Sequence, residues 1–167
     1  MSEKDYTLLE GKRILAVDDE PDVLDSLEEL LPMCRVDKAG SYEEAEGLLK
    51  TRPYDLAILD IMGVKGYELL EICRIRGVIA VMLTAHALSP EDIVASYRRG
   101  AANYLPKERM EGIRDDLEEI LEAHRKGEPF WSRWLERWDA FYGRKFGPDW
   151  KDRDRDFWES FPHVGPF

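Results

Sequence analysis

Short apolar runs alternate with segments of helical period along the first 126 residues. The runs are rich in Val, Ile and Leu and predict buried strands, while the segments between them have the spacing of amphipathic helices. Five such units predict an α/β fold, a doubly wound parallel sheet with helices on both faces. The predicted strands cover residues 13–17, 34–39, 55–60, 78–84 and 102–105.

Local signals mark where the helices begin and end. Three helices begin where proline occupies a first-turn position or where Ser is followed by Glu three residues later, at Pro21, Ser41 and Pro90. The fifth helix is expected over residues 108–125. Gly127 then predicts its end and a boundary between two regions.

The composition changes abruptly at this boundary. All five tryptophans and all six phenylalanines lie in the last 41 residues, and their spacing predicts two amphipathic helices. We therefore divide the chain into a first domain, residues 1–126, and an aromatic-rich helical C-terminal extension, residues 127–167. The extension could pack on its own domain or on a second copy, recruit another protein, or be disordered.

Composition and charge exclude several classes of function. A hydrophobic share of 44% supports a real core, but a net charge of −11 disfavours nucleic acid and anionic membrane surfaces as partners. The longest apolar run is too short to span a bilayer, so a cytoplasmic location is expected. Cys34 and Cys73 lack metal-ligand spacing and are expected to be free thiols.

Polar residues follow four of the predicted strands. Asp18 and Asp19 follow the first, Asp60 the third, Thr84 the fourth and Lys107 the fifth. Parallel strands end at one edge of the sheet, and in the order 2-1-3-4-5 the first and third strands are neighbours. The three carboxylates should therefore converge there.

Three converging carboxylates repel one another and favour a bound cation. Oxygen ligands without His or Cys are typical of Mg²⁺, which often binds next to a phosphate. With Mg²⁺ and the Lys107 ammonium nearby, a phosphoryl group on Asp60 would be neutralised from two sides, and Thr84 could donate to it. The pattern predicts phosphoryl transfer to a carboxylate.

The sequence resembles the response-regulator receiver domains of two-component signalling over residues 11–125. The resemblance rests on "ILAVDDEP", "AILDIM" leading to "GYELL", "VMLTA" and "GAANYLPK", in order and at nearly the usual separations. It implies a set of roles for the matching positions. By this resemblance, Asp60 would be the phosphoacceptor and Lys107 the phosphoryl-binding lysine. Asp19 would bind the metal ion directly, Asp18 through a water molecule and Met62 through its carbonyl. Thr84 and Tyr104 would be the switch residues.

The resemblance also implies partners. Asp60 would take the phosphoryl group from a sensor histidine kinase, a phosphotransfer protein or a small donor such as acetyl phosphate. Thr84 and Tyr104 would then remodel the face formed by the fourth helix, fifth strand and fifth helix, which contacts a downstream protein or forms a homodimer. At most, such a chain phosphorylates and dephosphorylates itself and is no turnover enzyme.

Two loops depart from the receiver pattern. The loop "IMGVKG" after Asp60 is short and lacks a proline, and Glu108 stands where receivers carry a proline joined by a cis bond. A trans bond and a shifted loop are expected here, because a cis bond before a non-proline residue is costly. His86 could lie at the mouth of the site or be a plain loop residue.

These departures keep other functions open. The chain could be a receiver-fold scaffold that no longer responds to phosphorylation. A phosphohydrolase of the haloacid-dehalogenase type is a third hypothesis, although that family spaces its paired acids as Asp-x-Asp after the first strand, whereas Asp18 and Asp19 are adjacent.

Overall fold

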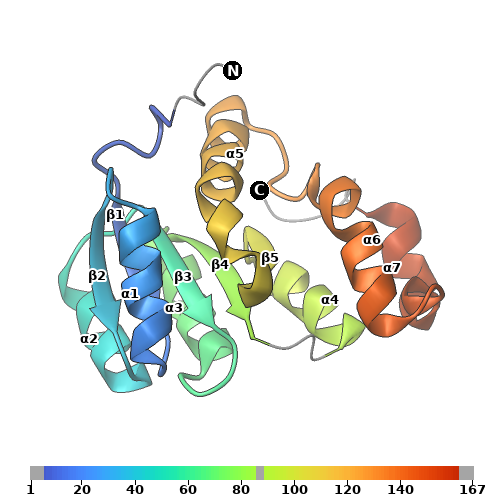
Figure 1. Ribbon diagram of the computed structural model, residues 1–167, viewed down its shortest axis with the longest axis horizontal. Helices are drawn as coiled ribbons and strands as arrows, with labels where there is room; N and C mark the ends of the chain where they lie inside the picture. Colours follow the sequence, from blue (N-terminus) through green and yellow to red (C-terminus); the bar gives the residue numbers. More distant parts are fainter. Residues whose placement is uncertain (1–5, 86–88, 162–167) are drawn as a thin grey trace.

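Five parallel strands form one sheet in the order β2-β1-β3-β4-β5 (Figure 1). The computed structural model describes residues 6–85 and 89–161. The strands are β1 Arg13–Val17, β2 Arg35–Ala39, β3 Leu56–Asp60, β4 Ile79–Thr84 and β5 Asn103–Pro106. The predicted fold class and strand order are confirmed. Strands β2, β3, β4 and β5 each begin one residue later than expected, and β5 also ends one residue later.

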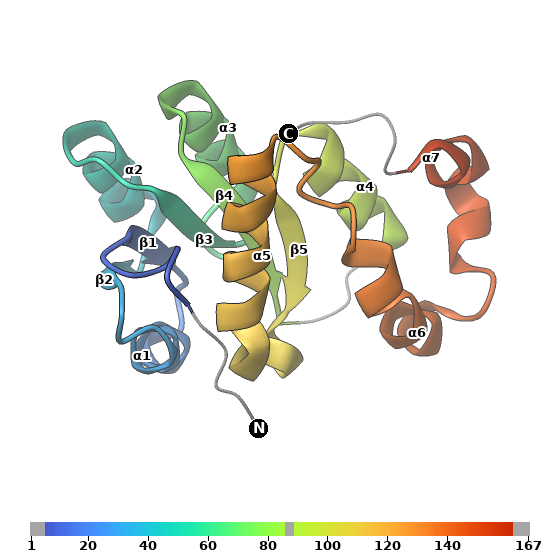
Figure 2. The same ribbon diagram turned by 90° about the horizontal axis from the view of Figure 1, so that it is seen from above.

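Helices cover both faces of the sheet, with α1 and α5 on one face and α2, α3 and α4 on the other (Figure 2). They are α1 Pro21–Leu30, α2 Tyr42–Thr51, α3 Gly66–Arg76, α4 Pro90–Arg98, α5 Ile113–Lys126, α6 Trp134–Phe146 and α7 Arg155–Ser160. Two 3-10 helices, η1 Lys107–Gly112 and η2 Trp150–Asp154, complete the fold. Among the residues described, none of these helices combines the length and apolar character needed to cross a membrane.

The central strand β3 is buried along its whole length. Leu56, Ala57, Ile58 and Leu59 are inaccessible to solvent, as expected for a parallel strand covered on both faces. Asp60 ends this strand and is 7% exposed. A rigid, buried strand therefore delivers one carboxylate to the edge of the sheet.

The predicted helix signals are seen in the structure, with one exception. The Ser41 hydroxyl accepts a hydrogen bond from the Glu44 amide at 3.2 Å, and Gly127 ends α5 with a left-handed backbone. The expected helix over residues 108–125 is wrong at its start, because η1 follows β5 and α5 begins only at Ile113. Within η1, Arg109 leaves the helical conformation.

The C-terminal extension packs on its own chain beyond the β5 edge, next to α4 and α5 (Figures 1 and 2). The ring of Tyr97 on α4 lies 5.2–5.3 Å from the rings of Trp131, Phe157 and Phe161. The aromatic side chains of the extension thus join the core of the sheet in one continuous cluster. Of the alternatives for the extension, the structure shows intramolecular packing.

The two cysteines form no disulfide, as expected. Cys73 is buried on α3, whereas Cys34 is half-buried just before β2 and donates a hydrogen bond to the Leu9 carbonyl at 3.3 Å. Burial raises the pKa of the Cys34 thiol to about 11, so it is not a reactive thiolate at neutral pH.

Candidate phosphoacceptor site

The register of the strands brings the predicted site residues to one edge of the sheet. Val17 pairs with Leu59, so that Asp18 and Asp60, which follow them, end neighbouring strands. Asp60 pairs with Leu83, and Thr84 pairs with Pro106, the residue before Lys107. Each side chain is thus placed by the end of a hydrogen-bonded strand.

The ammonium of Lys107 lies among the carboxylates. Its Nζ atom is 2.6 Å from Oδ2 of Asp18 and 3.3 Å from Oδ1 of Asp60. The Lys107 side chain is only 10% exposed, so these contacts are sheltered from water. The predicted convergence of Asp18, Asp60 and Lys107 is what the structure shows.

The charges at this edge are strongly coupled. Burial, followed by the negative charge of Asp18, raises the pKa of Asp60 to about 6, against the opposing effect of Lys107. Burial lowers the pKa of Lys107, but the hydrogen bond to Asp18 and the charge of Asp60 outweigh it and leave the pKa raised. At neutral pH the lysine is therefore an ammonium, and Asp60 is largely a carboxylate that burial has left poorly solvated.

Three adjacent acids supply oxygen atoms for a cation. Carboxylate oxygens of Asp18, Asp19 and Glu20 lie within 4.8 Å of one another. Oδ1 of Asp18 accepts a hydrogen bond from the Glu20 amide at 2.9 Å, which fixes the orientation of this carboxylate. A set of hard oxygen donors beside Asp60 fits Mg²⁺.

Glu20 is a residue that sequence reasoning missed as a possible ligand. Its Oε1 atom also lies 4.0 Å from Nζ of Lys107. Its position directly after Asp18 and Asp19 is the available signal, but in the sequence Glu20 also directly precedes the helix start at Pro21.

The loop between β3 and α3 is shaped by glycine. A Cβ atom on Gly66 would lie 2.2 Å from the Asp60 carbonyl oxygen, and one on Gly63 would lie 2.6 Å from Oδ2 of Asp19. The short loop therefore passes tightly against the site. The side chain of Met62 is 64% exposed and points away from the core; the predicted role of its carbonyl stays a prediction.

Comparison with known proteins identifies the family. The profile of the response regulator receiver domain matches residues 14–121. This chain belongs to that family. A two-component response regulator of Arabidopsis thaliana, ARR18, is 35% identical over 103 residues, which are 58% of this chain and 16% of that protein.

Solved receiver structures agree with the fold. A CheY-like receiver domain protein from Methanospirillum hungatei is 31% identical, with a TM-score of 0.64, over 70% of this chain and 98% of that one. TrrA of Thermotoga maritima, solved in complex with Mg²⁺ and beryllofluoride, is 30% identical with a TM-score of 0.57, over 65% of this chain and 97% of TrrA. The chain spans only 15–30% of the length of the curated relatives it matches.

The residues expected to act as switches in this receiver are both buried. Thr84 is 4% exposed at the end of β4, and Tyr104 is inaccessible to solvent in β5. Burial raises the pKa of the Tyr104 phenol, and the nearby Thr84 opposes this rise weakly. Their roles as switch residues and their movement stay predictions.

The loop after β5 keeps the receiver's lysine in place despite its unusual sequence. Lys107 reaches Asp18 and Asp60 although Glu108 stands where a proline was expected from the resemblance. The expected trans bond between Lys107 and Glu108 stays a prediction. His86 lies outside the described residues.

Proposed function

We propose that this receiver accepts a phosphoryl group on Asp60 in a reaction that depends on Mg²⁺. The observation that carries the proposal is the buried Asp60 carboxylate, 3.3 Å from the Lys107 ammonium and beside the acids Asp18 and Asp19. The donor is a sensor histidine kinase, a phosphotransfer protein or a small acyl phosphate.

Asp60 acts as the nucleophile. A carboxylate oxygen attacks the phosphorus of a phosphohistidine, the P–O bond forms, the P–N bond breaks, and the imidazole leaves with a proton. With acetyl phosphate the bond that breaks is P–O, and acetate leaves. Because the pKa of Asp60 is about 6, the nucleophilic carboxylate predominates above that pH.

Lys107 and the neighbouring acids stabilise the transferred group. The ammonium of Lys107 can turn from Asp18 and Asp60 toward a phosphoryl oxygen without leaving the site, because it already lies between the two carboxylates. Asp18, Asp19 and Asp60 would hold Mg²⁺, with the Met62 carbonyl as a further ligand. When bound, the metal ion offsets charge on the phosphoryl oxygens. Thr84 would donate a hydrogen bond to a third oxygen.

The output is a protein contact. The net charge of −11 disfavours binding to nucleic acid, and the family works with histidine kinases and downstream proteins. We place this chemistry in the cytoplasm, with homodimerisation as one form the contact could take.

Intact-mass spectrometry with Mg²⁺ and acetyl phosphate tests the proposal. Wild-type protein should gain one phosphoryl group, and Asp60→Asn should gain none. Asp55→Asn is the matched control, because Asp55 lies at the opposite end of the same strand and its carboxylate contacts only the Arg13 amide among the described hydrogen bonds. This control should be phosphorylated like the wild type.

The same measurement separates the proposal from the scaffold hypothesis. No adduct with acetyl phosphate or any other donor would contradict the proposal and favour a receiver that acts without phosphorylation. An adduct that persists in Asp60→Asn would place the acceptor elsewhere. Continuous release of phosphate from generic esters would instead favour a phosphohydrolase.

A further inference from the structure

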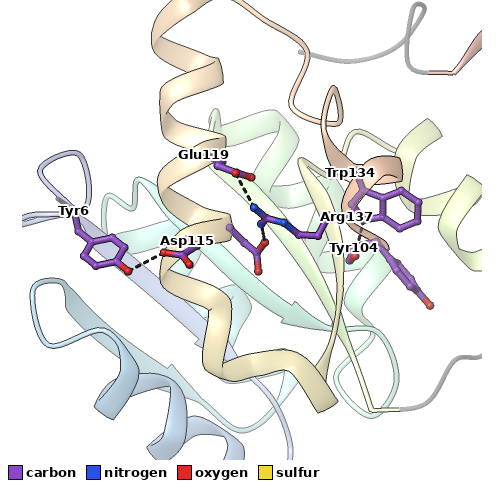
Figure 3. Close-up of polar contacts among 7 residues, drawn as sticks. Tyr6, Tyr104, Asp115, Glu119, Trp134 and Arg137 are labelled. Carbon is purple, nitrogen blue, oxygen red and sulfur yellow. Dashed lines mark hydrogen bonds and ion pairs between the residues drawn. The ribbon is translucent and has the colours of Figure 1, made fainter. Parts of the chain in front are cut away.

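The extension holds β5 by its backbone. The indole of Trp134 donates a hydrogen bond to the Tyr104 carbonyl at 2.8 Å, and the indole of Trp131 donates to the Ala101 carbonyl at 2.7 Å (Figure 3 shows Trp134 beside Tyr104). Both bonds are buried. Side chains of the extension thus bind the backbone once within β5, at Tyr104, and once just before the strand, at Ala101.

The extension also confines the ring of Tyr104. The ring of Tyr142 on α6 lies 5.9 Å from that of Tyr104 and stacks on Trp134 at 5.5 Å. Tyr142 and Tyr104 are both inaccessible to solvent. A residue three positions before Lys107 is therefore fixed through both its carbonyl and its ring.

The extension also binds Glu108, the residue directly after Lys107 in the sequence. Nζ of Lys145 on α6 lies 2.8 Å and 3.1 Å from the two carboxylate oxygens of Glu108. This pair is exposed and contributes little alone, but it ties the residue directly after Lys107 to α6. Lys107 is thus held from both sides by contacts with α6.

We propose that the C-terminal extension is a positioning element of the phosphoacceptor site, which holds the Lys107 ammonium against Asp60 through Trp134 and Tyr142. The proposal rests on the proposed function for its effect on phosphorylation, but not for the placement of Lys107. A long, flexible lysine side chain needs a fixed backbone to present its ammonium at one point. Displacement of a positioning group by about 1 Å can slow a reaction by up to ~100-fold.

Two substitutions in the full chain test this proposal. Trp134→Phe removes the hydrogen bond to Tyr104 and keeps an aromatic ring. Trp131→Phe is the matched control, because it removes the same kind of bond, to Ala101, which lies before the start of β5 and six residues before Lys107. Melting temperatures verify that both variants remain folded.

The first readout is the reactivity of Lys107 itself. An amine-acylating reagent and peptide mass mapping give the acylation rate of Lys107 relative to Lys50, an exposed lysine on α2. Trp134→Phe should raise this ratio several-fold, since Lys107 is sheltered only while it lies between Asp18 and Asp60. Trp131→Phe should leave the ratio near that of the wild type.

The second readout is the rate of phosphorylation by acetyl phosphate. Trp134→Phe should be slower by on the order of tenfold, and Trp131→Phe should stay within about twofold of the wild type. If the wild type is phosphorylated but Lys107 is equally reactive in the two variants, the inference is wrong and the proposed function stands. If Lys107 becomes more reactive but the wild type is never phosphorylated, the placement stands and the proposed function is wrong.

Discussion

Gly63 illustrates how one residue shapes the acidic cluster. Its φ of +82° lies in the left-handed region, and a Cβ atom added to it would lie 2.6 Å from Oδ2 of Asp19, so that a side chain here would have to displace this carboxylate. The Asp19 carboxylate can therefore lie where it does because Gly63 has no Cβ atom.

Gly63→Ala should weaken Mg²⁺ binding by about 10–100-fold, because its Cβ would push against the carboxylate that the metal needs. It should also destabilise the fold by roughly 1–2 kcal/mol through its backbone conformation. Isothermal titration calorimetry with MgCl₂ gives the affinity.

Gly77→Ala is the control for this substitution. Gly77 also has a positive φ, +72°, but an added Cβ would have no atom within 4 Å. It should lose similar stability and keep wild-type Mg²⁺ affinity. Equal affinities for the two variants would show that Gly63 does not position Asp19.

The residues of the site were largely predictable from the sequence, and the reason is topological. Strand ends in a parallel sheet must share an edge, so Asp18, Asp60 and Lys107 could be placed together before any distance was known. Glu20 and Gly63 were missed because their roles depend on loop geometry. The spacing of apolar and polar residues along the sequence does not indicate which loop atoms lie close to which carboxylate.

Helix α5 is held from two sides by hydrogen bonds to its acidic residues (Figure 3). On one side, the Tyr6 hydroxyl donates to Asp115 at 2.7 Å, and the amides of Leu8 and Leu9 donate to Glu118. On the other, Arg137 of α6 pairs with Asp116 and, at 2.7 Å, with Glu119. The acidic side chains of α5 therefore bind both the N-terminal segment before β1 and helix α6 of the extension.

Asp116 makes this packing sensitive to pH. It is 7% exposed, and burial raises its pKa to about 6, against the opposing charge of Arg137. The folded protein then binds the proton more tightly than the unfolded chain does. The stability that this group contributes is fully present below pH 4 and is lost as the pH rises through 6.

The free energy of unfolding should fall by about 1 kcal/mol between pH 5 and pH 7.5 because of Asp116. Urea unfolding of the wild type and of Asp116→Asn at both pH values measures the contribution of Asp116 to this fall. The other titrating groups, including Asp60, are the same in the two proteins, so their contributions cancel in the comparison. The variant should show a smaller fall. An equal fall in both would mean that Asp116 titrates like an exposed carboxyl group.

The start of α5 shows the limit of sequence patterns at the scale of an element. Residues 108–111 are good helix formers, so the propensity predicted a helix directly after Lys107. Lys107 must instead turn back to Asp18 and Asp60, and the chain after it forms a 3-10 helix up to Gly112. Long-range contacts override the local preference here, and they are absent from any local pattern.

At the scale of the whole molecule, the extension covers the face of α4, β5 and α5. This is the face on which a change at the phosphoacceptor would be expected to act. Its coverage by Trp131, Trp134 and Tyr142 means that a partner or a second copy must either displace the extension or bind elsewhere. Spacing of the aromatic residues predicted the helices of the extension but not which surface they would cover.

Removal of residues 127–167 should expose apolar surface around Tyr97 and Tyr104. The truncated receiver should bind a hydrophobic dye, lose solubility or self-associate, because the aromatic cluster that buries both rings is gone. Dye fluorescence and light scattering after size exclusion measure this. A truncated protein that stays monomeric and as soluble as the full chain would contradict the packing role.

Borohydride reduction followed by peptide mapping shows which residue of this receiver carries the phosphoryl group. Borohydride reduces an acyl phosphate on aspartate to homoserine, which marks the modified residue. After incubation with Mg²⁺ and acetyl phosphate, we expect homoserine at position 60 and at no other aspartate. Reduction at Asp18 or Asp19, or at no residue while a phosphoryl adduct is present, would contradict the role of Asp60 as the phosphoacceptor.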